Sequence, residues 1–285
     1  MAASMKDIKL RIHSVESTMQ ITKAMELVAS SKLRHAQEQM AKSRPYFETL
    51  YKKLSDIAAA NRDFSSPYTQ SREIRRTCWI VIAGDRGLAG GYNSNVLKTA
   101  AAEMEGTQAV VLPIGKKAVE FFRRRGVPIL TEVYAEAGDV SVSDCFTLAR
   151  SLCKGFCDGA YDEIRIAYTN FISVLAQQPA TLRLLPLRVE TSGEDASASA
   201  GQDILYEPDS ESVYNVIVPE YLGGLVYGAL CESVASELGA RRTAMDSATK
   251  NAKEMIGDLN LKYNRARQGA ITQEITEIVA GAQDE

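Results

Sequence analysis

The first 57 residues carry an apolar repeat with the period of a coiled coil. From Met5 to Ile57, apolar or small residues recur at alternating three- and four-residue steps, and only three polar side chains interrupt the series: Thr22, Glu26 and Ser43. This spacing is the heptad pattern of a helix that pairs along one seam with another helix. It predicts a helix of about 60 residues, roughly 90 Å long.

A second seam of the same kind closes the chain, between Leu222 and Ile278. No proline follows Pro219, so a continuous helix is permitted here. Both predicted helices join one central region, near Ala60 and Asp209, and we therefore expect them to pair antiparallel. The C-terminal helix is the longer of the two, so its final segment is expected to extend past the N-terminus.

The region between the seams has a different pattern, in which short runs rich in Val and Ile alternate with helix-like segments. The predicted parallel strands are 77–83, 109–114, 128–134 and 163–168, and the helices between them are 94–104, 116–125 and 143–157. Alternating strands and helices predict an open, mostly parallel sheet covered by helices. A further run, 181–187, follows a turn at Gln177–Pro179 and is expected to pair back antiparallel to 163–171.

Together these patterns predict an α/β fold class: a long antiparallel coiled coil of the N- and C-terminal helices plus a central open, mostly parallel α/β sheet domain. The predicted domains are an N-terminal coiled-coil helix (1–60), an α/β (Rossmann-like) domain (61–208) and a C-terminal coiled-coil helix (209–285). Pro45 lies inside the first seam and lacks a backbone donor, so we expect it to kink or interrupt that helix.

The end of the C-terminal helix carries apolar side chains that nothing in this chain is left to cover: Ala270, Ile271, Ile275, Ile278 and Val279. An uncovered apolar strip usually marks a binding surface. Just before it, residues 241–267 hold seven Lys or Arg against three Asp or Glu, and only acids follow. This basic stretch is either a solvated helix face or a positive collar that meets an acidic partner.

The composition of the chain gives no sign of a nucleic-acid-binding, membrane-spanning or secreted protein. The net charge is −3, which gives no global field in favour of nucleic acid, and 45% hydrophobic with 24% charged residues is typical of a soluble globular chain. We find no apolar run of membrane-spanning length and no signal-peptide pattern, so a cytoplasmic protein is expected. Cys153 and Cys157 lie one helical turn apart without a nearby His or third Cys, which favours packing over a metal site.

The strongest enzyme-like signal is the glycine-rich segment 84–91, Gly-Asp-Arg-Gly-Leu-Ala-Gly-Gly, between a predicted strand and a predicted helix. Phosphate-binding loops occur at such places. Neither the G-x-x-x-x-G-K-[ST] pattern nor the G-x-G-x-x-G spacing is present, however. A tight turn that lets backbone pass close to another surface is therefore favoured, and we predict no catalytic residue, no cofactor and no metal.

Motifs at both ends resemble one family, the γ subunits of F-type ATP synthases. The N-terminal motif is Ile21-Thr22-Lys23-Ala24-Met25-Glu26-Leu27-Val28-Ala29, followed by Ser43-Arg44-Pro45-Tyr46, and the C-terminal motif covers 266–278. The segments 84–93 and 205–209 resemble internal motifs of the family. Small departures are Ala89, where a Cys is common, and Gly269-Ala270, where Ala-Ser is frequent.

The resemblance implies a rotor shaft with two contact regions. The residues implied to contact the ring of α and β subunits are Met25, Glu26, Gly87, Ala89, Arg267, Gln268, Thr272, Glu274, Ile275 and Ile278. Those implied to contact the membrane c ring and ε, as a foot, are Arg44, Tyr46, Leu205, Tyr206 and Glu207, although Tyr46 and Tyr206 could equally pack inside the α/β domain. Met25 is expected close to Arg267 and Gln268 across the helix pair.

The implied partners are the α, β, δ and ε subunits and the c ring, with one copy of this chain per complex, at the cytoplasmic face of a bacterial cell membrane. Two other hypotheses remain. The chain could be a nucleotide- or phosphate-binding enzyme with a coiled-coil arm and its site at 84–93, or a dimeric scaffold whose seams pair between chains. Nucleotide binding by the isolated chain would favour the first of these, and a concentration-dependent dimer would favour the second.

Overall fold

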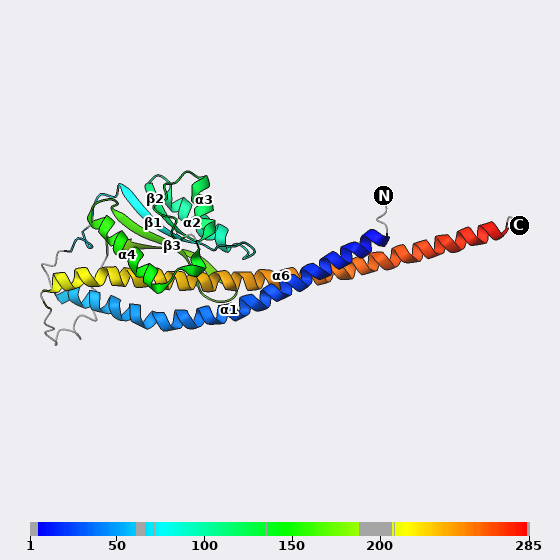
Figure 1. The fold of residues 1–285 in the computed structure, drawn as a ribbon, viewed down its shortest axis with the longest axis horizontal. Coiled ribbons are helices and arrows are strands. Elements are labelled where there is room, and N and C mark those ends of the chain that lie inside the picture. Colours follow the sequence, from blue (N-terminus) through cyan, green and yellow to red (C-terminus); the bar gives the residue numbers. More distant parts are fainter. Residues whose placement is uncertain are drawn as a thin grey trace. The chain divides into compact units, whose positions relative to one another are not determined.

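The computed structural model describes residues 5–60, 66–70, 72–134, 136–187, 207 and 209–283 (Figure 1). The chain divides into two compact units, one of Met1–Ser30 with Arg241–Glu285 and the other of Ser31–Ala240. We call them the helical unit and the sheet unit. Two long helices, α1 (Met5–Ala60) and α6 (Ser210–Gln283), contribute residues to both.

The helical unit is an antiparallel pair made from the start of α1 and the end of α6 (Figure 1). Its buried residues are spaced in multiples of seven: Ile8, Thr22 and Ala29 on α1, and Met245, Ala252 and Leu259 on α6. All six belong to the predicted seams, so the heptad prediction is confirmed. Helix α1 continues through Pro45 to Ala60, so the expected kink or interruption at this proline is wrong as far as an interruption is concerned.

The sheet unit is built on four strands, β1 (Arg76–Ile82), β2 (Gln108–Ile114), β3 (Glu163–Phe171) and β4 (Gln177–Leu185), in the order β2-β1-β3-β4. β1 pairs parallel with β2 and β3, while β4 pairs antiparallel with β3. The mostly parallel sheet with an antiparallel edge was predicted. One predicted strand is wrong: 128–134 makes only an isolated bridge, Ile129 to Val111, and then turns.

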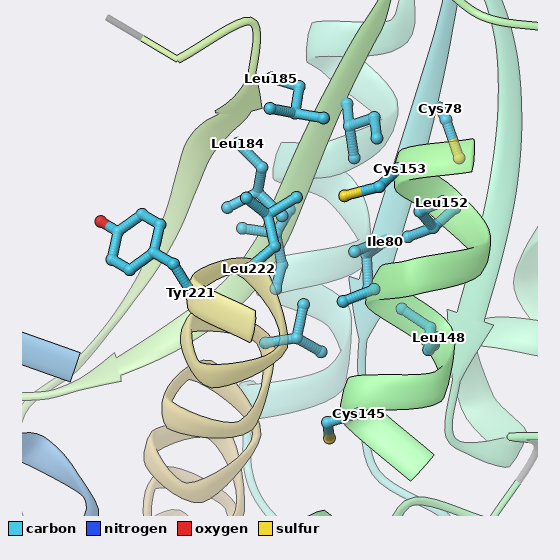
Figure 2. Close-up of a cluster of buried hydrophobic side chains, with 14 of the residues drawn as sticks. Cys78, Ile80, Cys145, Leu148, Leu152, Cys153, Leu184, Leu185, Tyr221 and Leu222 are labelled. Atoms are coloured by element: carbon cyan, nitrogen blue, oxygen red, sulfur yellow. The ribbon is translucent and has the colours of Figure 1, made fainter. Parts of the chain in front are cut away.

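Helices cover both faces of the sheet because the side chains of β1 alternate between two apolar clusters. Trp79 and Val81 pack with α2 (Tyr92–Met104) and α3 (Lys116–Arg124). Ile80 packs on the other face with α4 (Val142–Cys157) and α6, where Figure 2 shows Leu148 and Leu152 of α4 opposite Leu222 of α6. Burial on both faces explains why these strands read as continuous apolar runs.

Candidate contact surfaces and a closed glycine-rich loop

A polar layer interrupts the apolar seam of the helical unit. Thr22 and Thr249 face each other with their hydroxyl oxygens 2.8 Å apart, and each hydroxyl is also within hydrogen-bond distance of a carbonyl of its own helix, that of Met19 or Met245. Each hydroxyl has one proton to donate, so one Thr donates to the other and the second donates to its helix. We use the name polar layer for this Thr pair and the charges beside it.

Four charged side chains flank the Thr pair in two ion pairs. Lys23 Nζ lies 2.9 Å from Glu26 Oε2, and Lys250 Nζ lies 2.8 Å from Asp246 Oδ2. The hydrogen bond from Lys250 lowers the pKa of Asp246, with a smaller contribution from Lys23 of the other helix. The Glu26 side chain is only 14% exposed. Since Glu26 is already paired and turned away from solvent, it offers little to a partner's charges.

The polar layer defines the register of the antiparallel pair, that is, which residue of α1 lies beside which residue of α6. Arg267 lies 18 residues beyond Thr249, which is about 27 Å along a helix. Met25 is therefore level with the region around Asp246, and the predicted proximity of Met25 to Arg267 and Gln268 is wrong. In the same register Met5, the first described residue of α1, is level with Ala266.

The predicted contact residues at the end of α6 are exposed. This holds for Arg267, Gln268, Thr272, Glu274, Ile275 and Ile278, and the side chain of Ile278 is 71% exposed. Ile271, Ile275, Ile278 and Val279 all lie beyond the level of Met5, where no described residue of α1 covers them. We call these four residues the tip patch. A group of large apolar side chains without a cover in the chain is the kind of surface that another protein buries.

Removing one hydroxyl of the polar layer is expected to cost the helical unit about 1 kcal/mol, the net value of a typical hydrogen bond. We predict this destabilisation for Thr22→Val, because Val keeps the shape of Thr but leaves Thr249 with only its own helix carbonyl. The measurement is urea unfolding of the purified chain. Thr18→Val is the matched control, since Thr18 bonds the carbonyl of Ser14 in the same way on an exposed face. Equal effects of the two substitutions would contradict an inter-helix bond of any energetic weight.

The glycine-rich segment 84–91 lies at the carboxyl end of β1, as predicted, and its ends are tied together. The Gly84 N–H donates to Asn93 Oδ1 at 2.8 Å, and Asn93 Nδ2 donates to the carbonyl of Arg86 at 3.0 Å. Leu88 has a φ of +64°, an uncommon conformation for a leucine, and its side chain is 64% exposed. The segment is a fixed loop that presents an apolar side chain to solvent.

Asp85 binds backbone donors of two other segments of the chain. Its Oδ1 accepts the N–H groups of Lys116 (3.2 Å) and Ala137 (2.9 Å), and its Oδ2 accepts that of Gly138 (3.3 Å). Lys116 is the first residue of α3, and the first N–H groups of a helix are the ones that bind phosphate in nucleotide-binding folds. The carboxylate of Asp85 thus ties the glycine-rich loop to the start of α3 and to the short 3-10 helix 137–139, which is a structural role.

The remaining predicted contact residues differ in their exposure to solvent. Gly87 is exposed, whereas Ala89 is only 3% exposed and its methyl group faces the interior. Leu88, which the sequence pattern did not single out, is the large apolar residue that this loop exposes to solvent. Arg44 and Tyr46 belong to α1, but their side chains lie outside the described residues, as do Leu205 and Tyr206; Glu207 is exposed.

Within the described part of the chain, no group of three or more His, Cys, Asp or Glu side chains is arranged as a metal site. Nor does any helix in those ranges combine the length and apolar character that crossing a bilayer requires.

A heptad-paired helical unit that carries an exposed apolar patch is typical of proteins that pack against other proteins. A sequence model of the family described as ATP synthase matches residues 4–284. The ATP synthase gamma chain of Ruminococcus albus is 46% identical over 282 residues, covering 97% of this chain and 96% of that protein. The sodium-ion-specific ATP synthase gamma chain of Acetobacterium woodii is 42% identical, covering 99% of both. The chain belongs to the family of ATP synthase gamma chains, and the predicted family is confirmed.

Solved structures share the fold at low sequence identity. A chain of the Euglena gracilis mitochondrial ATP synthase superposes with a TM-score of 0.65 at 18% identity, covering 98% of this chain and 93% of that one. A chain from the central stalk and c ring of the Tetrahymena thermophila mitochondrial ATP synthase gives a TM-score of 0.59 at 22% identity, covering 80% of this chain and 99% of that one. These likenesses support the fold of two long helices around a mostly parallel sheet.

Proposed function

We propose that this chain is the central-stalk γ subunit of an ATP synthase. It turns inside a ring of α and β subunits and couples ion flow through a membrane c ring to ATP synthesis or hydrolysis at the β subunits. The observation that carries the proposal is the gamma-chain identity of 46% over nearly the whole length. The nucleotide-binding enzyme is not favoured, because gamma chains match this chain over nearly its whole length and segment 84–91 has neither of the two phosphate-binding patterns.

Coupling of this kind requires only contact, not catalysis in this chain. A shaft without rotational symmetry touches each surrounding subunit differently, so its angle decides which conformation of each subunit is favoured. It acts as a ligand with different affinity for each state, and ATP chemistry stays at the β subunits. We accordingly propose that the chain has no catalytic site of its own.

The proposed contacts follow from exposure. The tip patch and the exposed residues Arg267, Gln268, Thr272 and Glu274 would turn inside the α and β ring. In the sheet unit, Gly87 and Leu88 would meet the ring from the glycine-rich loop. Met25 and Glu26 are half-buried and would contribute through the shape of the helix pair more than through direct charge contact.

The other end is proposed to be a foot. Arg44, Tyr46, Leu205, Tyr206 and Glu207 would contact the c ring and ε, with δ as a further member of the complex. We propose the domain division 1–60, 61–208 and 209–285 for these roles, and a peripheral location at the cytoplasmic face of a bacterial cell membrane.

Reconstitution with the α and β subunits tests the proposal. We expect the wild-type chain to form a complex that hydrolyses ATP, while the chain alone binds no ATP. A variant with Ile271, Ile275 and Ile278 each replaced by Ser should assemble more weakly, because the tip patch no longer offers apolar area. Val216→Ser is the control, since Val216 is also an exposed apolar residue of α6 but lies in the sheet unit. Micromolar ATP binding by the chain alone, or a homodimer in place of the complex, would contradict the proposal.

A further inference from the structure

Helix α6 replaces a missing strand at one point of the sheet. The pairing of β1 with β3 ends at Val81 and Ala167, so Thr169 lies past the last β1 partner of β3. Two serines of α6 form hydrogen bonds with the backbone of Thr169 there. Its N–H donates to Ser233 Oγ at 3.2 Å, and Ser236 Oγ donates to its carbonyl at 3.2 Å. Both serine side chains have no exposed surface.

This arrangement is not the usual behaviour of serine in a helix. A helical Ser commonly points to solvent or bonds a carbonyl one turn earlier in its own helix. Ser233 and Ser236 lie three residues apart on one helix face, and both reach the same residue of a neighbouring strand. We call the two serines and Thr169 the serine clamp.

A few residues further along α6, the helix packs against the turn between β3 and β4. Gly239 lies so close to it that an added Cβ would meet Gln177 Nε2 at 3.3 Å and Phe171 Cε2 at 3.5 Å. Beside it, Ala235 and Leu238 of α6 pack with Leu33 and Ala36 of α1. The sheet unit ends at Ala240. The serine clamp and this turn are therefore among the last contacts that the sheet makes with α6 within the unit.

The structure assigns to the serine clamp the task of fixing the rotational phase of α6 relative to the sheet, and so of passing torque from the sheet to the shaft. This inference rests on the proposed function. Apolar contacts are non-directional and tolerate a small rotation of a helix about its axis. Hydrogen bonds weaken steeply when their angles change. A pair of hydrogen bonds from one helix face to the N–H and C=O of a single residue resists such a rotation in both senses.

A single-molecule measurement on the assembled complex tests the inference. The ring is held on a surface, and a bead is attached through Cys157, the one exposed thiol among the five cysteines. The bead's angular variance during the pauses of ATP-driven rotation is then recorded. We expect the double variant Ser233→Ala/Ser236→Ala to raise this variance about twofold, because two hydrogen bonds are lost while the small, helix-favouring Ala keeps the packing.

Controls separate the clamp from general stability. Ser151→Ala removes an exposed serine from α4 and should leave the variance at the wild-type value. Ser236→Ala alone keeps half of the clamp and should give an intermediate variance, which preserves the test if the double variant folds poorly. Ser233→Thr keeps the hydroxyl at this position and should therefore leave the variance closer to the wild-type value than Ser233→Ala/Ser236→Ala does. An unchanged variance in both alanine variants would overturn the inference. Absence of rotation with the wild-type chain would instead overturn the proposed function.

Discussion

Gly115→Ala is expected to destabilise the chain by about 4 kcal/mol, within the range of the most damaging single substitutions. Gly115 has a φ of +97°, and a Cβ added there would lie 2.0 Å from the carbonyl oxygen of Ala83 and 2.8 Å from its carbonyl carbon. Both atoms are backbone at the end of β1, where the Ala83 N–H bonds Ile114. Neither can move without breaking the junction of β1, β2 and α3, so the variant should unfold at a clearly lower temperature and urea concentration than the wild type.

The measurement is thermal or urea unfolding followed by circular dichroism, with Gly126→Ala as the matched control. Gly126 also has a positive φ, +67°, but an added Cβ there meets nothing within 4 Å. Its replacement should cost only the conformational penalty, about 1 kcal/mol. The difference between the two variants isolates the close approach to Ala83, and equal losses of stability would show that this approach carries no cost.

Asp85→Ala is expected to cost about 3 kcal/mol and to create an anion site that the wild type lacks. Three backbone N–H groups lose their acceptor, and each unsatisfied donor costs about 1–3 kcal/mol, less where water enters. An oxyanion can replace the lost carboxylate. Added inorganic phosphate should therefore raise the melting temperature of Asp85→Ala, since a ligand that binds only the folded state stabilises it.

Two comparisons make this prediction specific. The wild type should show no such phosphate effect, because its own carboxylate occupies the donors. Asp258→Ala removes an exposed acid of α6 and should change neither stability nor the response to phosphate by a measurable amount. A melting temperature of Asp85→Ala that is independent of phosphate would mean that the loop closes in some other way.

The elements with strong periodicity could be predicted from the sequence. Strands β1 and β3 are apolar runs buried on both faces, and the buried residues of the helical unit follow the heptad repeat. The segment 128–134 was predicted wrongly because its Ile, Leu and Val content favours a strand, whereas its pairing with β2 is limited to one bridge at Ile129. Pattern alone does not reveal whether a neighbouring strand is available along the whole run.

The register of the helix pair could not be predicted from the apolar pattern alone. A heptad seam repeats every seven residues, so sliding one helix by seven restores the same apolar match. What distinguishes one register is a polar contact, here between Thr22 and Thr249. Thr22 was visible as an interruption of the seam, but its partner was not, and Met25 was therefore placed against the wrong part of α6.

The role of Asp85 was hidden because its donors lie far away in the sequence. Lys116 and Ala137 follow it by 31 and 52 residues. Lys116 comes near Asp85 because β2 ends beside β1 at the same edge of the sheet, and Ala137 lies in a short 3-10 helix that the apolar pattern does not reveal. Leu88 was overlooked for another reason. A leucine inside a glycine-rich segment carries no sign of its backbone conformation, and its exposure follows from that conformation.

The spacing of the buried residues in the helical unit has a mechanical consequence. It is a multiple of seven residues on both helices: Ile8, Thr22 and Ala29 on α1, and Met245, Ala252 and Leu259 on α6. An α-helix has 3.6 residues per turn, so helices that keep a seven-residue contact repeat wind around each other in a left-handed supercoil. Twisting a supercoiled helix pair in one sense presses its two helices together, whereas twisting it in the opposite sense separates them. The helical unit is therefore expected to be stiffer under torque of one sign than under torque of the other.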